Sequence, residues 1–227
     1  MDRQGFNNIG LIIVLLGIGT FSNAQELITN GNFNYFDECA PQSLSSSVDL
    51  EPWFWTFGSP DFLHPCFPAS YSVPLSTGGG GQPILGEGYC GILSYSTSVT
   101  LREFVSIELN MALAQNVAYH VSFHVSMMDS IWYATRNIGV VFTPDEPPTA
   151  LSALISLEPQ VKYEGSGFLD NKEDWTKVEG SFTAQGGERY LTIGNFDTDE
   201  ETDTLFVVGG GTPRNNLRYF GVEPIIT

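Results

Sequence analysis

Aromatic residues in turn-rich segments are the side chains whose types and spacing best suit a chemical role. Trp53 and Trp55 lie in one dense aromatic group, and Trp132 and Tyr133 follow directly after a strand-like segment. Sugar rings present apolar C–H faces that stack on exposed aromatic planes, while neighbouring polar groups satisfy the hydroxyls. Large rings also fill β-sandwich cores, and we expect at least one of Trp53 and Trp55 to do so. For this pair, the sequence leaves a ligand platform and core packing both open.

Histidine and carboxylate patterns give little support for catalysis or for a transition-metal site. His120 and His124 are four residues apart on one face of the same strand-like segment, which separates them by roughly 13 Å. The sequence contains neither the Gly-x-Ser-x-Gly elbow of serine hydrolases nor a Cys-x-x-Cys zinc spacing. Paired carboxylates could hydrolyse glycosides, but abundance alone does not indicate such a pair. We therefore expect a protein that is not an enzyme, with a carboxylate-based glycoside hydrolase as the less favoured alternative.

The charge balance is strongly acidic. The chain has 26 Asp and Glu against 9 Lys and Arg, with a net charge of −17. Such a chain repels phosphate backbones and anionic lipid surfaces, so we exclude nucleic acid as a partner. Residues 197–203 concentrate five carboxylates between two predicted strands, and a solvated hairpin tip accounts for them. This segment lacks the glycine and the spacing of an EF-hand calcium loop.

Residues 1–24 have the pattern of a cleavable signal peptide. Arg3 lies in a short polar segment, an apolar run follows, and Ser22 to Ala24 supply small residues before cleavage after Ala24. The apolar run of about ten residues is shorter than the roughly 20 that a membrane-spanning helix needs, and no comparable run follows. We expect residues 25–227 to form a secreted or periplasmic or cell-surface protein without a transmembrane segment.

Three cysteines occur in a compartment that permits disulfides. Cys39 and Cys66 lie in proline-rich, turn-rich segments, whereas Cys90 lies in a strand-like context of small residues. A disulfide can fasten long loops of an exported protein. We expect a bridge between Cys39 and Cys66, with Cys90 unpaired and buried as a small apolar residue.

Alternating apolar residues predict an all-β fold. Strand-like alternation or apolar enrichment covers residues 27–33, 105–109, 119–128, 138–142, 178–182, 190–196, 205–208 and 217–226. Many strands without helices to cover a parallel sheet predict a single antiparallel two-sheet β-sandwich, or jelly roll, over residues 25–227. Residues 150–157 are the best helical candidate, and residues 37–90 are expected to form long loops.

Several segments together resemble one group of modules. The opening Leu27-Ile-Thr-Asn-Gly-Asn-Phe-Asn34 is similar to the L-x-x-N-G-x-F-E start of carbohydrate-binding-module jelly rolls of the galactose-binding-like class, and Trp175–Ala184 is similar to their W-x-x-V-x-G-x-F-T-A strand. Residues 119–126 with Asp129 resemble a subgroup from exported proteins of Gram-negative bacteria that often precedes an OmpA-like domain. The resemblance covers nearly all of residues 25–227 and implies a jelly roll that binds carbohydrate.

The resemblance also implies roles for individual charged residues. Related modules hold a structural calcium, and the matching positions here are Asn34 and Glu223, where an amide replaces one acidic ligand and Pro224 replaces an Asp. Asp61, Arg102, Glu103 and Asp129 match charged positions of the subgroup, where such residues either bind ligand or fasten loops.

These observations favour a secreted, non-catalytic binding module for carbohydrate or a cell-surface polymer. Its expected ligand-binding residues are Trp53, Trp55, Asp61, Arg102, Asp129, Trp132 and Tyr133. The alternative is a structural or adhesive surface protein that contacts other proteins through the same aromatic residues. A grooved aromatic surface would favour the first function, and a flat one the second.

Overall fold

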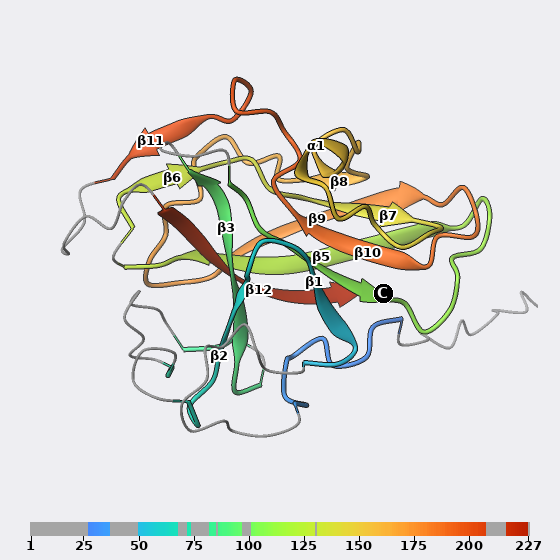
Figure 1. The fold of residues 1–227 in the computed structure, drawn as a ribbon, viewed down its shortest axis with the longest axis horizontal. Coiled ribbons are helices and arrows are strands. Elements are labelled where there is room, and N and C mark those ends of the chain that lie inside the picture. Colours follow the sequence, from blue (N-terminus) through green and yellow to red (C-terminus); the bar gives the residue numbers. More distant parts are fainter. Residues whose placement is uncertain are drawn as a thin grey trace, which may run out of the picture.

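A computed structural model describes residues 27–36, 50–67, 72–73, 82–84, 86–96, 101–129 and 131–207, and the backbone of residues 217–226. In this part of the chain, the strands form two five-stranded antiparallel sheets and one two-stranded antiparallel sheet (Figure 1). The β10 sheet has the order β1 (Trp53–Phe57), β4 (Phe104–Glu108), β10 (Tyr190–Gly194), β7 (Gly139–Thr143) and β8 (Val161–Lys162). The β5 sheet has the order β2 (Asp61–Leu63), β3 (Tyr89–Ser96), β12 (Leu217–Ile226), β5 (Ala118–Met127) and β9 (Thr176–Thr183). The third sheet pairs β6 (Tyr133–Thr135) with β11 (Thr204–Phe206).

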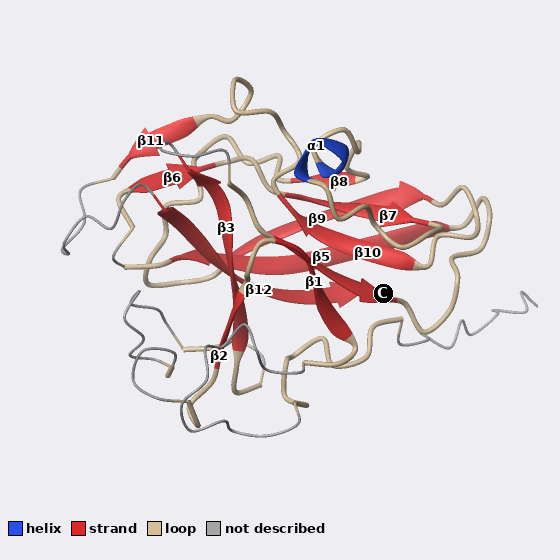
Figure 2. Cartoon of the chain, viewed as in Figure 1, coloured by secondary structure: helices blue, strands red, loops and turns tan. Residues whose placement is uncertain are grey.

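The main core lies between the two five-stranded sheets. Ile107 and Leu191 of the β10 sheet share one buried apolar cluster with Phe123 and Val178 of the β5 sheet. Because successive side chains of a strand point to opposite faces, the alternating apolar residues of each sheet face this core. The predicted antiparallel two-sheet β-sandwich is therefore confirmed, and Figure 2 shows how little helix accompanies it.

The outer face of the β10 sheet is partly covered. The one-turn helix α1 (Leu151–Leu154) buries Leu154 in a cluster with Phe104, Val141 and Phe196. The expected helix over residues 150–157 is thus a single turn, because no side chain caps its start and Pro159 follows soon after its end. Under this cover, the Ser106 hydroxyl lies 2.7 Å from that of Thr192. The centre of this face is closed to a large ligand.

The expected strand at residues 27–33 is wrong. This segment forms turns, with Asn30 and Phe33 at φ 57° and 55°. The Asn30 side chain donates to the carbonyl of Tyr35 at 2.7 Å and accepts from the N–H of Tyr35 at 2.9 Å. Such side-chain to backbone bonds compete with a sheet ladder, which the apolar pattern alone does not reveal.

Residues 37–90 contain more regular structure than expected. β1 and β2 both lie in this range, and β1 pairs with β4 so that Trp53 is opposite Ile107 and Trp55 opposite Val105. The aromatic residues that suggested a loop instead form an edge strand, because aromatic side chains pack well on a half-buried sheet.

Cys90 is free and fully buried, as expected. Burial, with smaller contributions from Glu103 and Asp61, raises the pKa of its thiol well above the usual value. The sulfur of Cys66 lies 3.0 Å from His64 Nδ1. Cys39 lies outside the described residues, so the Cys39–Cys66 bridge stays a prediction.

Candidate functional site

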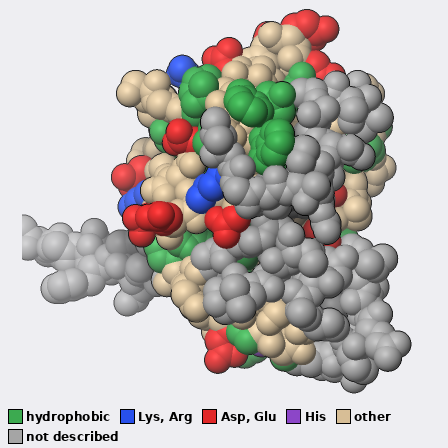
Figure 3. Space-filling model, turned by 90° about the vertical axis from the view of Figure 1, so that its left-hand side faces the viewer, with side chains coloured by type: hydrophobic (Ala, Val, Ile, Leu, Met, Phe, Trp, Pro, Cys, Tyr) green, Lys and Arg blue, Asp and Glu red, His purple; other side chains and the backbone are tan. Residues whose placement is uncertain are grey.

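A group of aromatic rings lies on the two-stranded sheet, with Phe206 exposed and Trp132 and Tyr133 half-buried. Tyr133 is directly opposite Phe206, with ring centroids 5.2 Å apart, and Trp132 lies 5.9 Å from Phe206 in an edge-to-face arrangement. Phe206 is 53% exposed and the neighbouring Leu205 is 39% exposed. We call Trp132, Tyr133 and Phe206 the aromatic cluster. Figure 3, which views the end of the molecule where β6 and β11 lie, shows hydrophobic side chains gathered on its upper part, next to charged ones.

A second apolar core includes the chain neighbours of the aromatic cluster. Ala134 is fully buried with Met128 and Ile131, and Val207 packs against them. The ammonium of Lys172 donates to the carbonyl oxygens of Asp129 and Ile131, both at 2.8 Å. Burial lowers the pKa of Lys172, against an opposing effect of Asp129. These contacts fix the turn that leads into Trp132.

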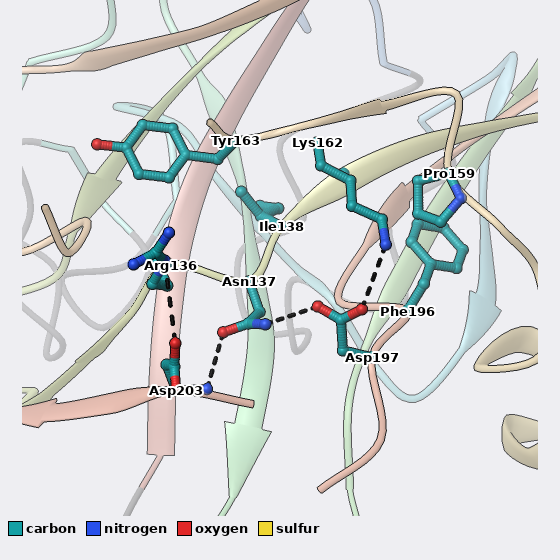
Figure 4. Close-up of a pocket in the computed structure, with 10 residues that line it drawn as sticks. Arg136, Asn137, Ile138, Pro159, Lys162, Tyr163, Phe196, Asp197 and Asp203 are labelled. Carbon is teal, nitrogen blue, oxygen red and sulfur yellow. Dashed lines mark hydrogen bonds and ion pairs between the residues drawn. The ribbon is translucent and has the colours of Figure 1, made fainter. Parts of the chain in front are cut away.

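A polar pocket of about 310 Å³ opens beside the two-stranded sheet. Its lining residues are Arg136, Asn137, Ile138, Gly139, Pro159, Lys162, Tyr163, Phe196, Asp197 and Asp203. We call this the polar pocket. Figure 4 shows Lys162 and Asn137 directed at Asp197, and Arg136 directed at Asp203. The pocket thus offers cationic, amide and carboxylate groups next to the rings of Tyr163 and Phe196.

Hydrogen bonds hold the pocket walls in place. Asn137 Nδ2 donates to Asp197 Oδ2 at 2.6 Å, and Asn137 Oδ1 accepts from the N–H of Asp203 at 2.9 Å. Lys162 Nζ lies 3.2 Å from Glu158 and 3.5 Å from Asp197. The pocket is therefore organised by its own side chains.

The aromatic cluster and the polar pocket lie at opposite ends of the β6–β11 pair. Thr135 of β6 pairs with Thr204 of β11, and Tyr133 pairs with Phe206 two positions further along. Arg136 comes directly after Thr135, and Asp203 directly before Thr204. At about 3.4 Å per residue, three steps separate the two ends by roughly 10 Å.

The acidic loop of residues 197–203 forms one wall of the pocket. It connects β10 to β11, which belong to different sheets, so the expected hairpin tip is wrong. Arg102 Nη2 donates to Asp199 at 2.7 Å and to the Thr202 hydroxyl at 3.2 Å. Asn195 Nδ2 donates to the same Thr202 hydroxyl at 3.0 Å.

Arg102 lies beneath the loop rather than at the surface. It is 1% exposed, and its guanidinium lies 5.8 Å from the Tyr95 ring centroid. Burial lowers its pKa, and the nearby Asp199 opposes that effect. The buried guanidinium anchors the loop, and a surface ligand does not reach it.

Glu103, the residue after Arg102, is a second buried anchor. Its carboxylate accepts the N–H groups of Leu93 at 2.8 Å and Ser59 at 3.1 Å. Burial is the main cause that raises its pKa to about 7, and the charge of Asp61 adds to it. Asp61 pairs with Gly91 between β2 and β3. A raised carboxyl pKa often marks an active site, but Glu103 lines neither described pocket.

The structure separates the other residues that the sequence suggested. Trp53 is 3% exposed, and its indole N–H donates to the Asn30 carbonyl at 2.9 Å, so its ring belongs mainly to the core. Trp55 is half-buried and packs against the main core. Asp129 is exposed at the turn before Trp132. Of the predicted aromatic residues, the structure brings together Trp132 and Tyr133.

The expected calcium ligands are not gathered in the described residues. The Asn34 side-chain oxygen accepts the N–H of Glu87 at 2.9 Å and so fastens a loop. Glu223 lies opposite His124 in β12, and its side chain is outside the described part. No group of three or more His, Cys, Asp or Glu suited to a metal ion occurs among the described residues. Calcium stays a prediction.

A second, shallower groove of about 420 Å³ lies at the uncovered end of the β10 sheet. It is lined by Glu51, Pro52, Trp53, Phe54, Glu108, Glu146 and Tyr190. The rings of Phe54 and Tyr190 meet edge to face with centroids 6.4 Å apart. Its walls are carboxylates and partly buried rings.

Sequence reasoning missed Phe206, Tyr163 and the cations of the polar pocket. Phe206 lies in a segment that the sequence predicts to be a strand. Its position just after the acidic run is the only feature of the sequence that could have marked it as exposed. Lys162 and Tyr163 lie far from Asp197 in sequence, and only the topology brings them together.

Comparisons with known proteins show no family for this chain. No family model matches the sequence, and no curated protein sequence matches it. In structure, the chain is similar to the CBM22-1 xylan-binding domain of Paenibacillus barcinonensis Xyn10C, with 12% identity over 77% of this chain and 83% of that one and a TM-score of 0.39. It is similar to the K1 cleaved adhesin domain of Lys-gingipain from Porphyromonas gingivalis, with 12% identity over 82% and 95% and a TM-score of 0.41. A Stig cyclase from Fischerella is also similar, with 10% identity over 86% and 96% and a TM-score of 0.44.

Proposed function

We propose that this protein is a non-catalytic module that binds a glycan or a similar cell-surface polymer. The observation that carries the proposal is the aromatic cluster, in which Phe206 is exposed and Trp132 and Tyr133 are half-buried, on the same strand pair as the polar pocket. Exposed rings stack on the apolar faces of sugars, and nearby polar groups bond the hydroxyls. The two features lie roughly 10 Å apart along one strand pair.

The chemistry of the pocket suits hydroxyl groups. Lys162 and Arg136 donate hydrogen bonds, Asp197 and Asp203 accept them, and the Tyr163 hydroxyl can do both. The volume of about 310 Å³ is at the small end of the roughly 300–1,000 Å³ range of small-molecule sites. A pocket of this size accommodates the end or a branch of a chain, while the rest extends over the aromatic cluster.

A binding role is supported over a catalytic one by the distribution of carboxyl groups. General acids need a raised pKa and contact with the substrate. Glu103 has the raised pKa, of about 7, but both its oxygens hold backbone N–H groups and it is 3% exposed. A carboxylate-based hydrolase is thus the less favoured function.

The second candidate is a structural or adhesive protein that contacts another protein. Leu205 and Phe206 are neighbours in sequence and both are exposed, and aromatic residues are enriched in protein interfaces. The polar pocket beside them favours the glycan, because a hollow with hydroxyl-matching groups serves a sugar better than a flat protein surface.

Export is part of the proposal. Residues 1–24 lie outside the described residues, and their signal-peptide pattern places residues 25–227 in the periplasm, at the surface or in the medium. None of the helices in the described segments has the length and apolar character to cross a membrane.

The test is binding of residues 25–227 to a broad glycan and polysaccharide panel, with and without a calcium chelator. We expect saturable binding that Trp132→Ala or Phe206→Ala weakens at least about tenfold while thermal unfolding is unchanged. Tyr35→Ala is the matched control, because Tyr35 is an aromatic residue 70% exposed outside the cluster.

Two outcomes would contradict the proposal. Binding to no member of the panel in either condition would favour the protein-contacting function instead. Binding that Tyr35→Ala weakens as much as Phe206→Ala would move the site away from the aromatic cluster.

A further inference from the structure

The two cations of the polar pocket are already matched by carboxylates. Lys162 Nζ lies between Glu158 at 3.2 Å and Asp197 at 3.5 Å. Arg136 Nε lies 4.0 Å from Asp203. Burial alone would lower the pKa of Lys162, but the hydrogen bonds and charges of Glu158 and Asp197 outweigh it and raise that pKa. Each cation therefore already has a carboxylate within 4.0 Å.

The acidic loop adds further negative charge to the same wall. Glu200 and Glu201 are exposed on it, and Glu201 is bonded to Thr198. The buried cation Arg102, which is not part of the loop, forms an ion pair with Asp199 of the loop. The pocket lining itself has two cations and two carboxylates, and the excess of negative charge comes from Glu158 and the rest of the acidic loop. The whole chain has the same sign of charge, −17.

We infer that the polar pocket selects uncharged saccharides over anionic ones such as uronates or sulfated sugars. The inference rests on the proposed glycan-binding function and names the class of ligand. A neutral sugar donates its hydroxyls to Asp197 or Asp203 and accepts from Lys162 or Arg136 without breaking an ion pair. An anionic sugar has to displace a carboxylate from its cation or lie against the carboxylates of the acidic loop, and like charges brought together weaken binding strongly.

The experiment compares neutral and anionic forms of the same backbone by native affinity electrophoresis of residues 25–227. The pairs are hydroxyethylcellulose with carboxymethylcellulose, dextran with carboxymethyl-dextran, and methyl-esterified pectin with polygalacturonate. We expect the neutral form of any backbone that is bound to bind at least about tenfold tighter. The difference in affinity between the neutral and anionic forms should become smaller when salt is raised to about 0.5 M, because salt screens exposed charges.

A matched pair of variants separates the pocket from the overall charge. Asp203→Asn removes the carboxylate beside Arg136, and its backbone bond to Asn137 is kept because the main-chain N–H makes it. Asp145→Asn makes the same charge change just beyond Thr143, at the end of β7 opposite the pocket residue Gly139. We expect Asp203→Asn to lower the ratio of neutral to anionic affinity at least about threefold, and Asp145→Asn to leave this ratio unchanged.

The outcomes are distinguishable. Equal or tighter binding of the anionic polymers would overturn the charge selectivity and leave glycan binding in place. If Asp145→Asn lowered the affinity ratio as much as Asp203→Asn did, the charge selectivity of the pocket would also be overturned. Net charge rather than the pocket would then be responsible. Binding to none of the six polymers, together with none on the wider panel, would overturn the proposed function and the selectivity with it.

Discussion

Arg102 Nη2 and Asp199 Oδ1 lie 2.7 Å apart, across 97 positions of sequence, and join the centre of the fold to the acidic loop. The guanidinium is 1% exposed and the carboxylate is 36% exposed. Among the described residues, the buried Nε and Nη1 atoms of Arg102 have no hydrogen-bond partner. Asp199 is therefore the main compensation for a buried cation, and the loop that forms one wall of the polar pocket depends on it.

Asp199→Asn should destabilise the fold by about 2 kcal/mol, which is below the roughly 3–5 kcal/mol of a fully buried pair because Asp199 is partly exposed. The free energy of unfolding from urea titration measures it. Glu200→Gln, the same kind of change one position along the exposed loop, should stay within about 0.5 kcal/mol. Equal effects of the two variants would mean that the Arg102 contact contributes nothing specific.

Glu103 should make stability depend on pH in a defined window. Its folded pKa of about 7 is above the ordinary 4.5, so the folded state holds a proton that the unfolded state has released between these values. Stability should fall as pH rises through this window, by roughly 3 kcal/mol in total, and then level off above it. Urea unfolding at several pH values measures the slope, and Glu103→Gln should remove it. A Gln variant with the wild-type slope would assign the pH dependence to other groups.

Trp53 and Trp132 should respond in opposite ways to replacement by Ala. Trp53 packs against Phe33 with ring centroids 5.1 Å apart and is buried, so Trp53→Ala should cost roughly 3–5 kcal/mol of stability. Trp132 is half-buried at the surface, so Trp132→Ala should lower glycan affinity with a much smaller loss of stability. Thermal unfolding and binding measured on both variants test the contrast, which would fail if Trp132→Ala were the more destabilising.

This contrast shows how far the sequence predicts the site. Trp53 and Trp132 are both tryptophans near residues typical of turns, and nothing in their local sequence distinguishes a core side chain from a surface one. What distinguishes them is pairing: β1 lies against β4, and β6 against β11. The sandwich itself was predictable, because alternation such as that of residues 119–128 depends only on neighbouring residues.

The acidic loop and the polar pocket could not be predicted for the same reason. Residues 197–203 have the composition of a solvated turn, and only the contact with Arg102 makes part of the loop an anchored wall. Likewise, residues 27–33 form turns instead of the expected strand. The Asn30 side chain stabilises these turns by hydrogen bonds to the carbonyl oxygens of Tyr35 and Glu51. Long-range partners decide these features, and a single sequence does not specify which residues meet.

Lys172 should act as a positioning residue for the aromatic cluster. Its ammonium bonds the carbonyls of Asp129 and Ile131, which fixes the turn before Trp132. Lys172→Met keeps the apolar stem and removes both bonds, so we expect a glycan affinity about three- to tenfold lower with a stability loss near 1 kcal/mol. The near-ultraviolet circular dichroism of the tryptophans should change, because the orientation of Trp132 changes. Lys177→Met, a surface change on β9, is the control and should alter none of these. If Lys172→Met lowered stability without changing the tryptophan signal or the affinity, the turn would not position the cluster.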